Sequence, residues 1–261
     1  MTGAMSEEKA WLRRYRPAPP SGSRLVCLPH AGGSASAFLP LARAVDPALD
    51  VVAVQYPGRQ DRRSEPNVGD LRTLADRIYP VLAGQSDRPL AIFGHSMGAV
   101  LAYEVTLRLE AAGKPPVHLF TSGRRAPSRY RDEQVHLRDD QGILAELALL
   151  DGTSSELIRD PDVISMIMPA LRNDYRAIET YRHEPGRAVA CPLTALVGDC
   201  DPKTSLDEAR DWAGHTTGPF DLRVFPGGHF YLNGQVPAVA ALVSGALAGP
   251  VGTAADSPTP V

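Results

Sequence analysis

The sequence predicts an α/β fold: a mostly parallel sheet flanked by helices, with a helical lid insertion in the second half of the chain. Three observations predict it. Short apolar runs alternate with longer amphipathic stretches, as in chains built from repeated β-α units. Several runs are almost continuous in Val, Ile, Leu and Ala, which is typical of strands buried on both faces. One interval between two expected strands, 122–192, far exceeds the roughly 30 residues of a complete βαβ unit.

The expected elements follow in order from these periodicities. Strands are expected at 25–28, 51–56, 90–93, 117–121, 193–197 and 222–225. Helices are expected at 35–45, 71–82, 97–111, 206–213 and 236–247. Because strands and helices alternate, the crossovers should place helices on both faces of a parallel sheet.

The long interval contains two further amphipathic runs, 143–150 and 163–181, and Pro169 is expected to kink the second. The apolar side chains that share one face of that second run are Ile164, Ile167, Leu171, Tyr175 and Ile178. We interpret residues 130–187 as a helical insertion over the strand ends, forming a lid that bounds a pocket. The lid residues expected to bound the acyl pocket are Leu147, Leu150, Ile164, Met168 and Leu171. An ordinary extra pair of packing helices is the alternative.

Composition limits the classes of partner. The 261 residues carry 27 Lys and Arg against 30 Asp and Glu, a formal charge of −3, which is too balanced for binding nucleic acid. No apolar run approaches the roughly 20 residues that span a bilayer, and the first 16 residues lack the apolar block of a secretory signal. We therefore expect a cytoplasmic protein, monomeric, with no nucleic-acid or membrane partner.

The chain is expected to form one domain with loose ends. Residues 1–23 should be loosely ordered, because 17–23 is rich in Pro and Ser, and 249–261 should be a flexible tail without periodicity. The domain would then occupy 24–248. The three cysteines lie far apart and show no metal-ligand spacing, so neither a metal site nor a cofactor is expected: Cys27, Cys191 and Cys200.

The segment 94–98, GHSMG, fits the GxSxG pattern of a nucleophile elbow. It follows an expected strand and opens an expected helix, which is the strand-turn-helix setting that the elbow requires. Ser96 would adopt a strained backbone conformation there, and Gly94 and Gly98 would be small because a Cβ would collide with the tight turn. Ser96 is therefore the candidate nucleophile.

A serine nucleophile needs a base, which in turn is oriented by an acid. His229 follows the last expected strand, in the loop 226–230, and should open at the same sheet edge as Ser96. His95 is expected to point into packing beside its strand, and His30 to line the pocket. The remaining histidines have structural or solvated surroundings: His118, His136, His183 and His215.

Two carboxylates follow the strand 193–197, Asp199 and Asp201. The chain order Ser, Asp, His is that of the α/β-hydrolase fold, so either could complete a triad. Asp201 is the better candidate because it lies further past the strand end, where Pro202 fixes a turn. Asp199 is expected to cap that turn through its own backbone.

The oxyanion formed on a substrate carbonyl needs two preorganised N–H donors. One should be the backbone amide of Met97, directly after the nucleophile. The other should be the amide of Ala31, in the Gly-rich loop 29–33 that follows the first expected strand. The alternative is that Gly32 and Gly33 form only a tight strand-to-helix turn.

With these motifs in place, the chain resembles the stand-alone (type II) thioesterases of polyketide and nonribosomal peptide synthesis. The matching blocks cover nearly the whole chain apart from its two ends: PHAGG at 29–33, YPGR at 56–59, GHSMG at 94–98, SGRRAP at 122–127, GDCDP at 198–202 and PGGHF at 226–230. The resemblance implies an α/β-hydrolase that removes acyl groups from the phosphopantetheine thiol of carrier proteins, clearing stalled or wrongly primed chains. It also assigns the acid to Asp201.

A cluster of arginines follows an expected strand end beside the insertion: Arg124, Arg125, Arg129 and Arg131. Arg124 and Arg125 in particular could attract an acidic carrier protein or the phosphate of its arm. A solvated surface is the alternative. For the whole protein, two other functions stay open: a general carboxylesterase or lipase acting on oxygen esters, and a non-catalytic module that binds carrier proteins.

Overall fold

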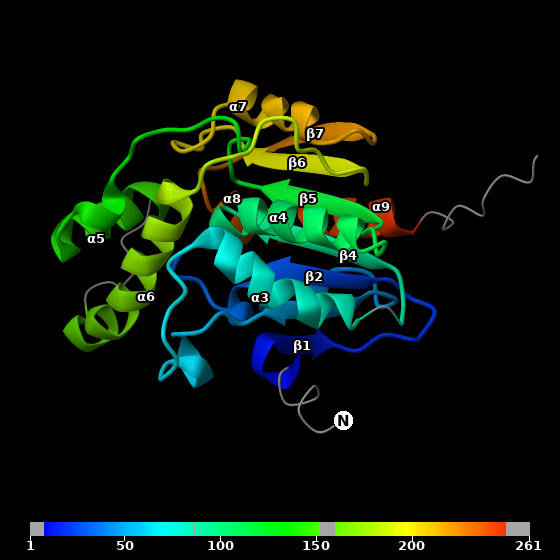
Figure 1. Ribbon diagram of the computed structural model, residues 1–261, viewed down its shortest axis with the longest axis horizontal. Coiled ribbons are helices and arrows are strands. Elements are labelled where there is room, and N and C mark those ends of the chain that lie inside the picture. The colour runs from blue at the N-terminus through cyan, green and yellow to red at the C-terminus, as the bar shows by residue number, and fades with distance from the viewer. Residues whose placement is uncertain (1–7, 86, 152–159, 249–261) are drawn as a thin grey trace, which may run out of the picture.

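The structure, a computed structural model, describes residues 8–85, 87–151 and 160–248. Over these residues seven strands form one sheet in the order β1-β3-β2-β4-β5-β6-β7, in which β1 is antiparallel to β3 and every other pair is parallel (Figure 1). The strands are β1 Leu12–Arg16, β2 Arg24–Leu28, β3 Asp50–Val54, β4 Leu90–His95, β5 His118–Ser122, β6 Leu193–Gly198 and β7 Phe220–Phe225. The predicted mostly parallel α/β sheet is confirmed.

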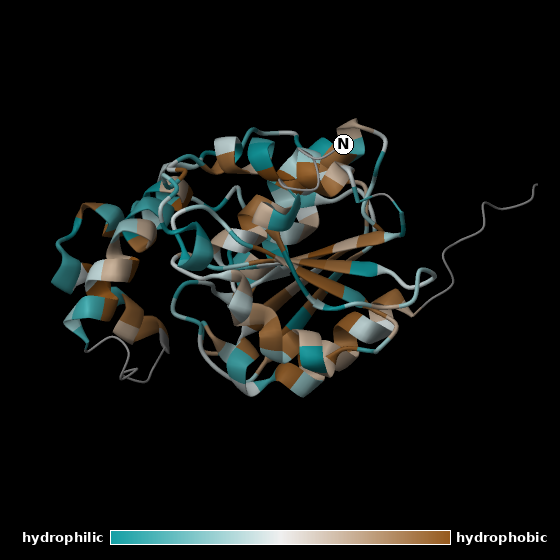
Figure 2. Ribbon diagram, turned by 90° about the horizontal axis from the view of Figure 1, so that it is seen from below, coloured by the Kyte–Doolittle hydropathy of each residue, from teal (hydrophilic) through white to brown (hydrophobic). Residues whose placement is uncertain are grey.

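Helices cover both faces of the sheet. The α-helices are α2 Leu39–Ala44, α3 Leu71–Ala83, α4 Met97–Ala111, α5 Asp140–Asp151, α6 Pro161–Thr180, α7 Leu206–Arg210, α8 Tyr231–Gly234 and α9 Val236–Leu247. Helices α3 and α4 pack together on one face, and α2 and α9 on the other. Figure 2 shows apolar residues along the central strands between these layers. The expected helix 35–45 is a 3₁₀ turn, Ala35–Phe38, followed by α2, and 206–213 likewise divides into α7 and the turn Asp211–His215.

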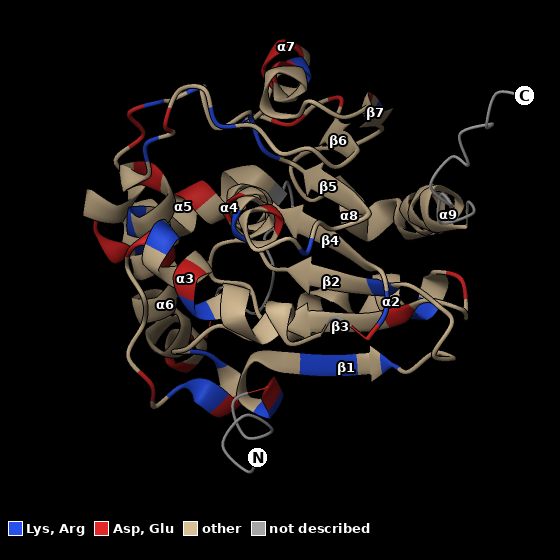
Figure 3. Ribbon diagram, turned by 45° about the vertical axis from the view of Figure 1, so that its right-hand side comes forward, with Lys and Arg blue, Asp and Glu red and all other residues tan. Residues whose placement is uncertain are grey.

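The expectation of a loosely ordered segment 1–23 is wrong for β1. Its backbone pairs with β3, with Leu12 opposite Val54, and Trp11 and Leu12 are buried. The guanidinium of Arg62 lies 4.3 Å from the Trp11 ring. The arginines of β1 (blue in Figure 3) interrupt the apolar pattern by which a strand is recognised in the sequence. They also suit a strand at the edge of the sheet, where charge discourages pairing with other chains. The other expected loose ends, residues 1–7 and 249–261, lie outside the described residues.

The insertion between β5 and β6 contains α5 and α6, which lie beyond the carboxyl ends of the parallel strands (Figure 1). Asp160 caps α6 by accepting a hydrogen bond from the Asp162 amide, and Pro169 lies within the helix. The two helices share a small hydrophobic core of their own with the turn before α5: Val135, Ile143, Met168, Leu171 and Tyr175. The insertion therefore stands over the sheet edge at which the candidate residues were expected.

Candidate active site

Ser96 lies at a sharp turn between β4 and α4, with φ 56° and ψ −119°. This backbone region is costly for a residue with a side chain, so the surroundings must enforce it. They leave no room for a Cβ on either flanking glycine: it would lie 2.0 Å from the Gly98 carbonyl oxygen at Gly94, and 2.1 Å from the Leu28 carbonyl oxygen at Gly98. The turn thus has the strained geometry expected of a nucleophile elbow.

The structure brings the three predicted triad residues together at the carboxyl ends of β4, β6 and β7. His229 Nε2 lies 2.9 Å from Ser96 Oγ. On the other side of the ring, Nδ1 lies 3.0 and 3.1 Å from the two carboxylate oxygens of Asp201. The backbone amide of Lys203 donates a further hydrogen bond to Asp201, at 2.8 Å. With His229 and Asp201 both buried, this chain can pass a proton from the serine to the imidazole with little competition from water.

The hydrogen bond of Asp199 differs from the one expected. It accepts a hydrogen bond from the amide of Gly227 at 2.9 Å, in the neighbouring loop that carries His229. The same amide is the main cause of the lowered pKa of Asp199. A Cβ at Gly198 would lie 2.3 Å from the Gly228 carbonyl oxygen, so the two loops are in close contact. Asp199 therefore joins the acid loop to the histidine loop, whereas sequence reasoning placed its cap within its own turn.

His95 packs beneath the triad, as predicted. Its Nδ1 lies 2.9 Å from Ser122 Oγ, which in turn lies 2.7 Å from the hydroxyl of Tyr231. Burial holds the pKa of His95 well below its ordinary value, so the ring is neutral at physiological pH. His95 thus supports the loop around His229 from inside the molecule.

The loop 29–33 is held from several sides. Its own turn closes through a hydrogen bond from the Gly33 amide to the His30 carbonyl, 2.9 Å. Tyr56 donates its hydroxyl proton to the Pro29 carbonyl at 3.1 Å, and the Gly32 amide donates to Asp174 at 2.8 Å. The segment between these anchors, His30 and Ala31, lines the same pocket as Ser96.

One pocket joins these elements, under the insertion. The residues that line it are His30, Ala31, Ser96, Met97, Arg124, Glu133, Leu147, Leu150, Tyr175, Ile178, Glu179, Lys203, His229 and Phe230. Both candidate oxyanion donors, Ala31 and Met97, are among them. So is His30, whose pKa burial lowers to about 4, helped by His229 and Arg59. The pocket has an apolar wall from α5 and α6 and a polar side from the ends of β5 and β6.

The lining corrects part of the sequence prediction for the insertion. Leu147 and Leu150 lie at the pocket, as predicted, but Met168 and Leu171 pack inside the insertion's own core and Ile164 packs against that core. Tyr175 and Ile178 of α6 provide the pocket wall instead. Their spacing on one face of the helix was visible in the sequence, but nothing there indicated which part of that face would meet the pocket.

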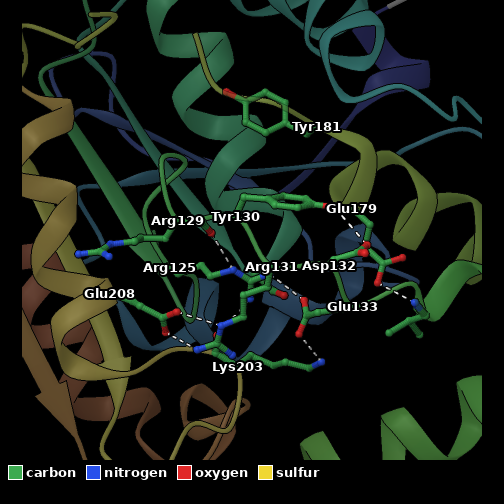
Figure 4. Close-up of polar contacts among 12 residues, drawn as sticks. Arg125, Arg129, Tyr130, Arg131, Asp132, Glu133, Glu179, Tyr181, Lys203 and Glu208 are labelled. Carbon is green, nitrogen blue, oxygen red and sulfur yellow. Dashed lines mark hydrogen bonds and ion pairs between the residues drawn. The ribbon is translucent and has the colours of Figure 1, made fainter. Parts of the chain in front are cut away.

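The predicted arginine patch is mostly neutralised (Figure 4). Arg125 is only 3% exposed and pairs with Glu133 at 2.7 Å, so the prediction that it contacts a partner at the surface is wrong. Arg129 pairs with Asp211, and Arg131 makes two hydrogen bonds to Glu208, at 2.9 and 2.6 Å. The sequence could not show these pairings, because most of the acidic partners come from the other side of the insertion.

Arg124 is the exception within this cluster. It lines the pocket, and within the described ranges no carboxylate lies at ion-pair distance from its guanidinium. Burial, with Arg125 adding to it, lowers the pKa of Arg124 to about 9, so the side chain remains charged at neutral pH. Arg124 is half-buried at the pocket, and a partly desolvated cation with no counter-ion among the described residues favours binding of an acceptor group from a ligand.

A partly buried ion-pair network that sequence reasoning missed joins the insertion to the loop that carries Asp201. Lys203 Nζ lies 2.8 Å from Glu133 and also pairs with Glu146 of α5, which Arg138 contacts at 2.9 Å. Lys203 follows Asp201 by two positions, so α5 is tied to the turn that holds the triad carboxylate. The spacing of these residues along the chain did not indicate the network.

Among the residues that the structure describes, no group of three or more His, Cys, Asp or Glu side chains is arranged to hold a metal ion. No helix in the described ranges has the length and apolar character needed to cross a bilayer.

Comparisons with known proteins agree with this architecture. Residues 23–247 match the family model described as "Thioesterase domain". The chain is 52% identical over 247 residues to the "Probable cadicidin biosynthesis thioesterase" of Streptomyces griseus, covering 95% of this chain and 68% of the relative. It is 49% identical over 228 residues to "Thioesterase PikA5" of Streptomyces venezuelae, covering 86% and 81%.

Solved structures agree as well. The type II thioesterase BorB from the borrelidin biosynthetic cluster superposes with a TM-score of 0.86 at 49% identity, covering 91% of this chain and 98% of that one. YbtT, the type II thioesterase of the yersiniabactin pathway, superposes with a TM-score of 0.81 at 31% identity, covering 92% and 98%. The chain therefore belongs to the thioesterase family, as a thioester hydrolase of α/β-hydrolase fold related to the type II thioesterases of polyketide and nonribosomal peptide biosynthesis.

Proposed function

We propose that this protein uses Ser96, His229 and Asp201 to hydrolyse acyl groups from the phosphopantetheine thiol of carrier proteins. The observation that carries the proposal is the continuous line of hydrogen bonds from Ser96 Oγ through the His229 ring to Asp201. Ser96 and His229 line the pocket beneath the insertion. Relatives named as biosynthetic thioesterases support the choice of a carrier-bound thioester as substrate.

The first half of the reaction transfers the acyl group to the enzyme. Ser96 Oγ attacks the thioester carbonyl while His229 Nε2 accepts its proton, and Asp201 keeps Nδ1 protonated and stabilises the charged ring. The amides of Ala31 and Met97 hold the oxyanion. The C–S bond then breaks, and the thiolate of the arm leaves and takes the proton from His229.

The second half releases the acid. A water molecule attacks the acyl-Ser96 carbonyl while His229 Nε2 accepts a proton from it. The bond from carbon to Ser96 Oγ breaks, and His229 returns the proton to the serine. The products are a free carboxylic acid and a carrier protein with a free thiol, which is the outcome that clearing a blocked synthase requires.

Arg124 and His30 are the proposed substrate contacts within the pocket. Arg124 can donate to an oxygen of the acyl group or of the arm, since it lines the pocket and forms no ion pair with a carboxylate of the residues that the structure describes. His30, neutral at physiological pH, packs against Phe230 with ring centroids 4.9 Å apart and bounds the pocket beside Ala31. The carrier protein itself would remain outside the pocket, with only its arm and acyl group inside. We place the enzyme in the cytoplasm, as a monomer.

The deciding experiment follows acyl loss from carrier proteins by mass spectrometry. Carrier proteins loaded with different acyl groups are incubated with the enzyme, with Ser96→Ala, and with matched oxygen esters of the same acids. We expect the wild-type enzyme to release acid from the carrier thioesters and the variant to release none. Equal or faster cleavage of the oxygen esters would favour a general esterase, and carrier binding without any cleavage would favour a non-catalytic module.

A further inference from the structure

We propose that Asp174 and Arg59 are positioning residues for the oxyanion hole. Asp174 lies on α6, 142 positions from Gly32 in the chain, yet its Oδ2 accepts the hydrogen bond of the Gly32 amide at 2.8 Å. The same oxygen pairs with Nη2 of Arg59. Gly32 directly follows Ala31, the proposed oxyanion donor, so the inference rests on the function proposed above.

The contact is buried and charged. The Asp174 side chain is 2% exposed and that of Arg59 6%, and Arg59 Nη1 donates to the Pro57 carbonyl at 2.6 Å. A buried carboxylate that accepts a backbone N–H makes a hydrogen bond stronger than one between neutral groups. The Gly32 amide is therefore fixed from α6 and, through Arg59, from the loop after β3.

A second pair of contacts restricts the movement of the same loop, 29–33. Tyr56 holds the Pro29 carbonyl, two residues before Ala31. Gly32 has φ +73°, and a Cβ there would lie 2.7 Å from Leu171 Cδ1, so α6 packs directly against the loop one turn before Asp174. The Ala31 amide thus lies between two anchored peptide units, as preorganised stabilisation of an oxyanion requires.

The two charges of the pair have separate tasks. A carboxylate beside an oxyanion hole would oppose the negative charge that develops there, because attraction and repulsion are strong in a water-poor site. Arg59 neutralises Asp174 and so removes that penalty. The contacts also account for two residues of the YPGR block at 56–59: Tyr56 contacts the oxyanion loop directly, and Arg59 contacts it through Asp174. Helix α6 is then a fixed wall of the site.

The test compares Asp174→Ala and Asp174→Asn with a matched control, Asp50→Asn. Asp50 is also a buried carboxylate paired with an arginine, Arg24 at 2.6 Å, but it lies at the amino end of β3, away from the active site. Three quantities are measured for each: kcat and KM for thioester hydrolysis, the melting temperature, and affinity for a trifluoromethyl ketone that forms a tetrahedral oxyanion on Ser96.

We expect Asp174→Ala to lower kcat about 10- to 100-fold with KM changed less than about 3-fold, and to weaken the ketone in proportion to kcat. Asp174→Asn keeps an acceptor for the Gly32 amide and should lose only about 3- to 10-fold. Asp50→Asn should lower the melting temperature with kcat unchanged. If Asp174→Ala does not fold, the Asn variant decides.

Two results would overturn the inference: wild-type kcat in folded Asp174 variants, or an equal loss of kcat in Asp50→Asn. Either would leave the proposed function intact as long as the wild-type enzyme hydrolyses carrier thioesters. Conversely, a wild-type enzyme that binds the ketone but cleaves no carrier thioester contradicts the proposed function alone, since ketone affinity still reports on Asp174.

Discussion

Ser96 and His229 are separated by 133 positions in the chain, yet the hydroxyl of one lies 2.9 Å from the imidazole of the other. The two side chains come from loops at the ends of different parallel strands, β4 and β7, with β5 and β6 between them in the sheet. Their contact therefore depends on the register and twist of four strands.

Ser96→Ala should remove thioester hydrolysis while leaving the fold unchanged. The hydroxyl is the attacking group, and loss of a triad nucleophile costs about 10⁶-fold in kcat in a comparable serine hydrolase. The check is single-turnover hydrolysis together with a melting curve. Retained turnover in a folded variant would contradict the assignment of the nucleophile.

Asp201→Asn should lower kcat by about 10⁴-fold, because an amide at this place favours the wrong tautomer of His229. Asp199→Asn is the matched control, with the same change of charge two residues away. Its side-chain oxygen can still accept the hydrogen bond of the Gly227 amide, and only the charge at this exposed position is lost, so we expect less than a 10-fold effect on kcat. If the Asp199 variant were the more damaged of the two, the acid would have been assigned to the wrong carboxylate.

Arg124→Met should raise KM for acyl-carrier substrates by about 10-fold or more, because a charged hydrogen bond to the substrate contributes roughly 1.5–3 kcal/mol. Met keeps length and apolar volume but cannot donate. Arg129→Met serves as control, since that arginine is exposed and paired with Asp211. Steady-state kinetics of both variants decide; equal KM values would mean that Arg124 makes no contact with the substrate.

Stability should fall as the pH falls from about 6.5 toward 4, and His215 should contribute to this fall. Burial lowers the pKa of His215 to about 4, with His183 adding to the effect and Asp211 opposing it. Between these pH values the unfolded chain binds a proton on this ring and the folded chain does not. The free energy of unfolding therefore rises with pH there, by up to about 1.4 kcal/mol per pH unit for one such group.

His215→Gln tests this linkage. The Ser128 hydroxyl lies 2.9 Å from His215 Nε2, and glutamine can replace that contact without titrating. Urea unfolding at several pH values between 4.5 and 7.5 should show a shallower pH dependence for the variant than for the wild type. Identical slopes would mean that the ring has the same pKa in the folded and unfolded chains.

Patterns of apolar residues along the sequence predicted most of the sheet, because the burial of a strand is visible in residues that are close together in the chain. Strands such as β2 and β6 are buried throughout, and an almost continuous apolar run of this length can satisfy burial in few other ways. Strand β1 was not predicted, because three of its five residues are arginines. It is a strand because it pairs with β3 and buries its first residue. Its stability comes from its neighbours.

The candidate site divides in the same way. The sequence by itself determined the elbow at Ser96, its strand-turn-helix setting and the loops that carry Asp201 and His229, because each depends on residues close together in the chain. Only the tertiary structure decided that Arg125 is buried in an ion pair, that Asp199 bridges two loops and that Asp174 reaches the oxyanion loop. The physical reason is that polar and charged groups are paired by where folding brings them in space. Spacing along the chain carries no record of the partner, whether it lies 8 positions away, as Glu133 does from Arg125, or 142, as Gly32 does from Asp174.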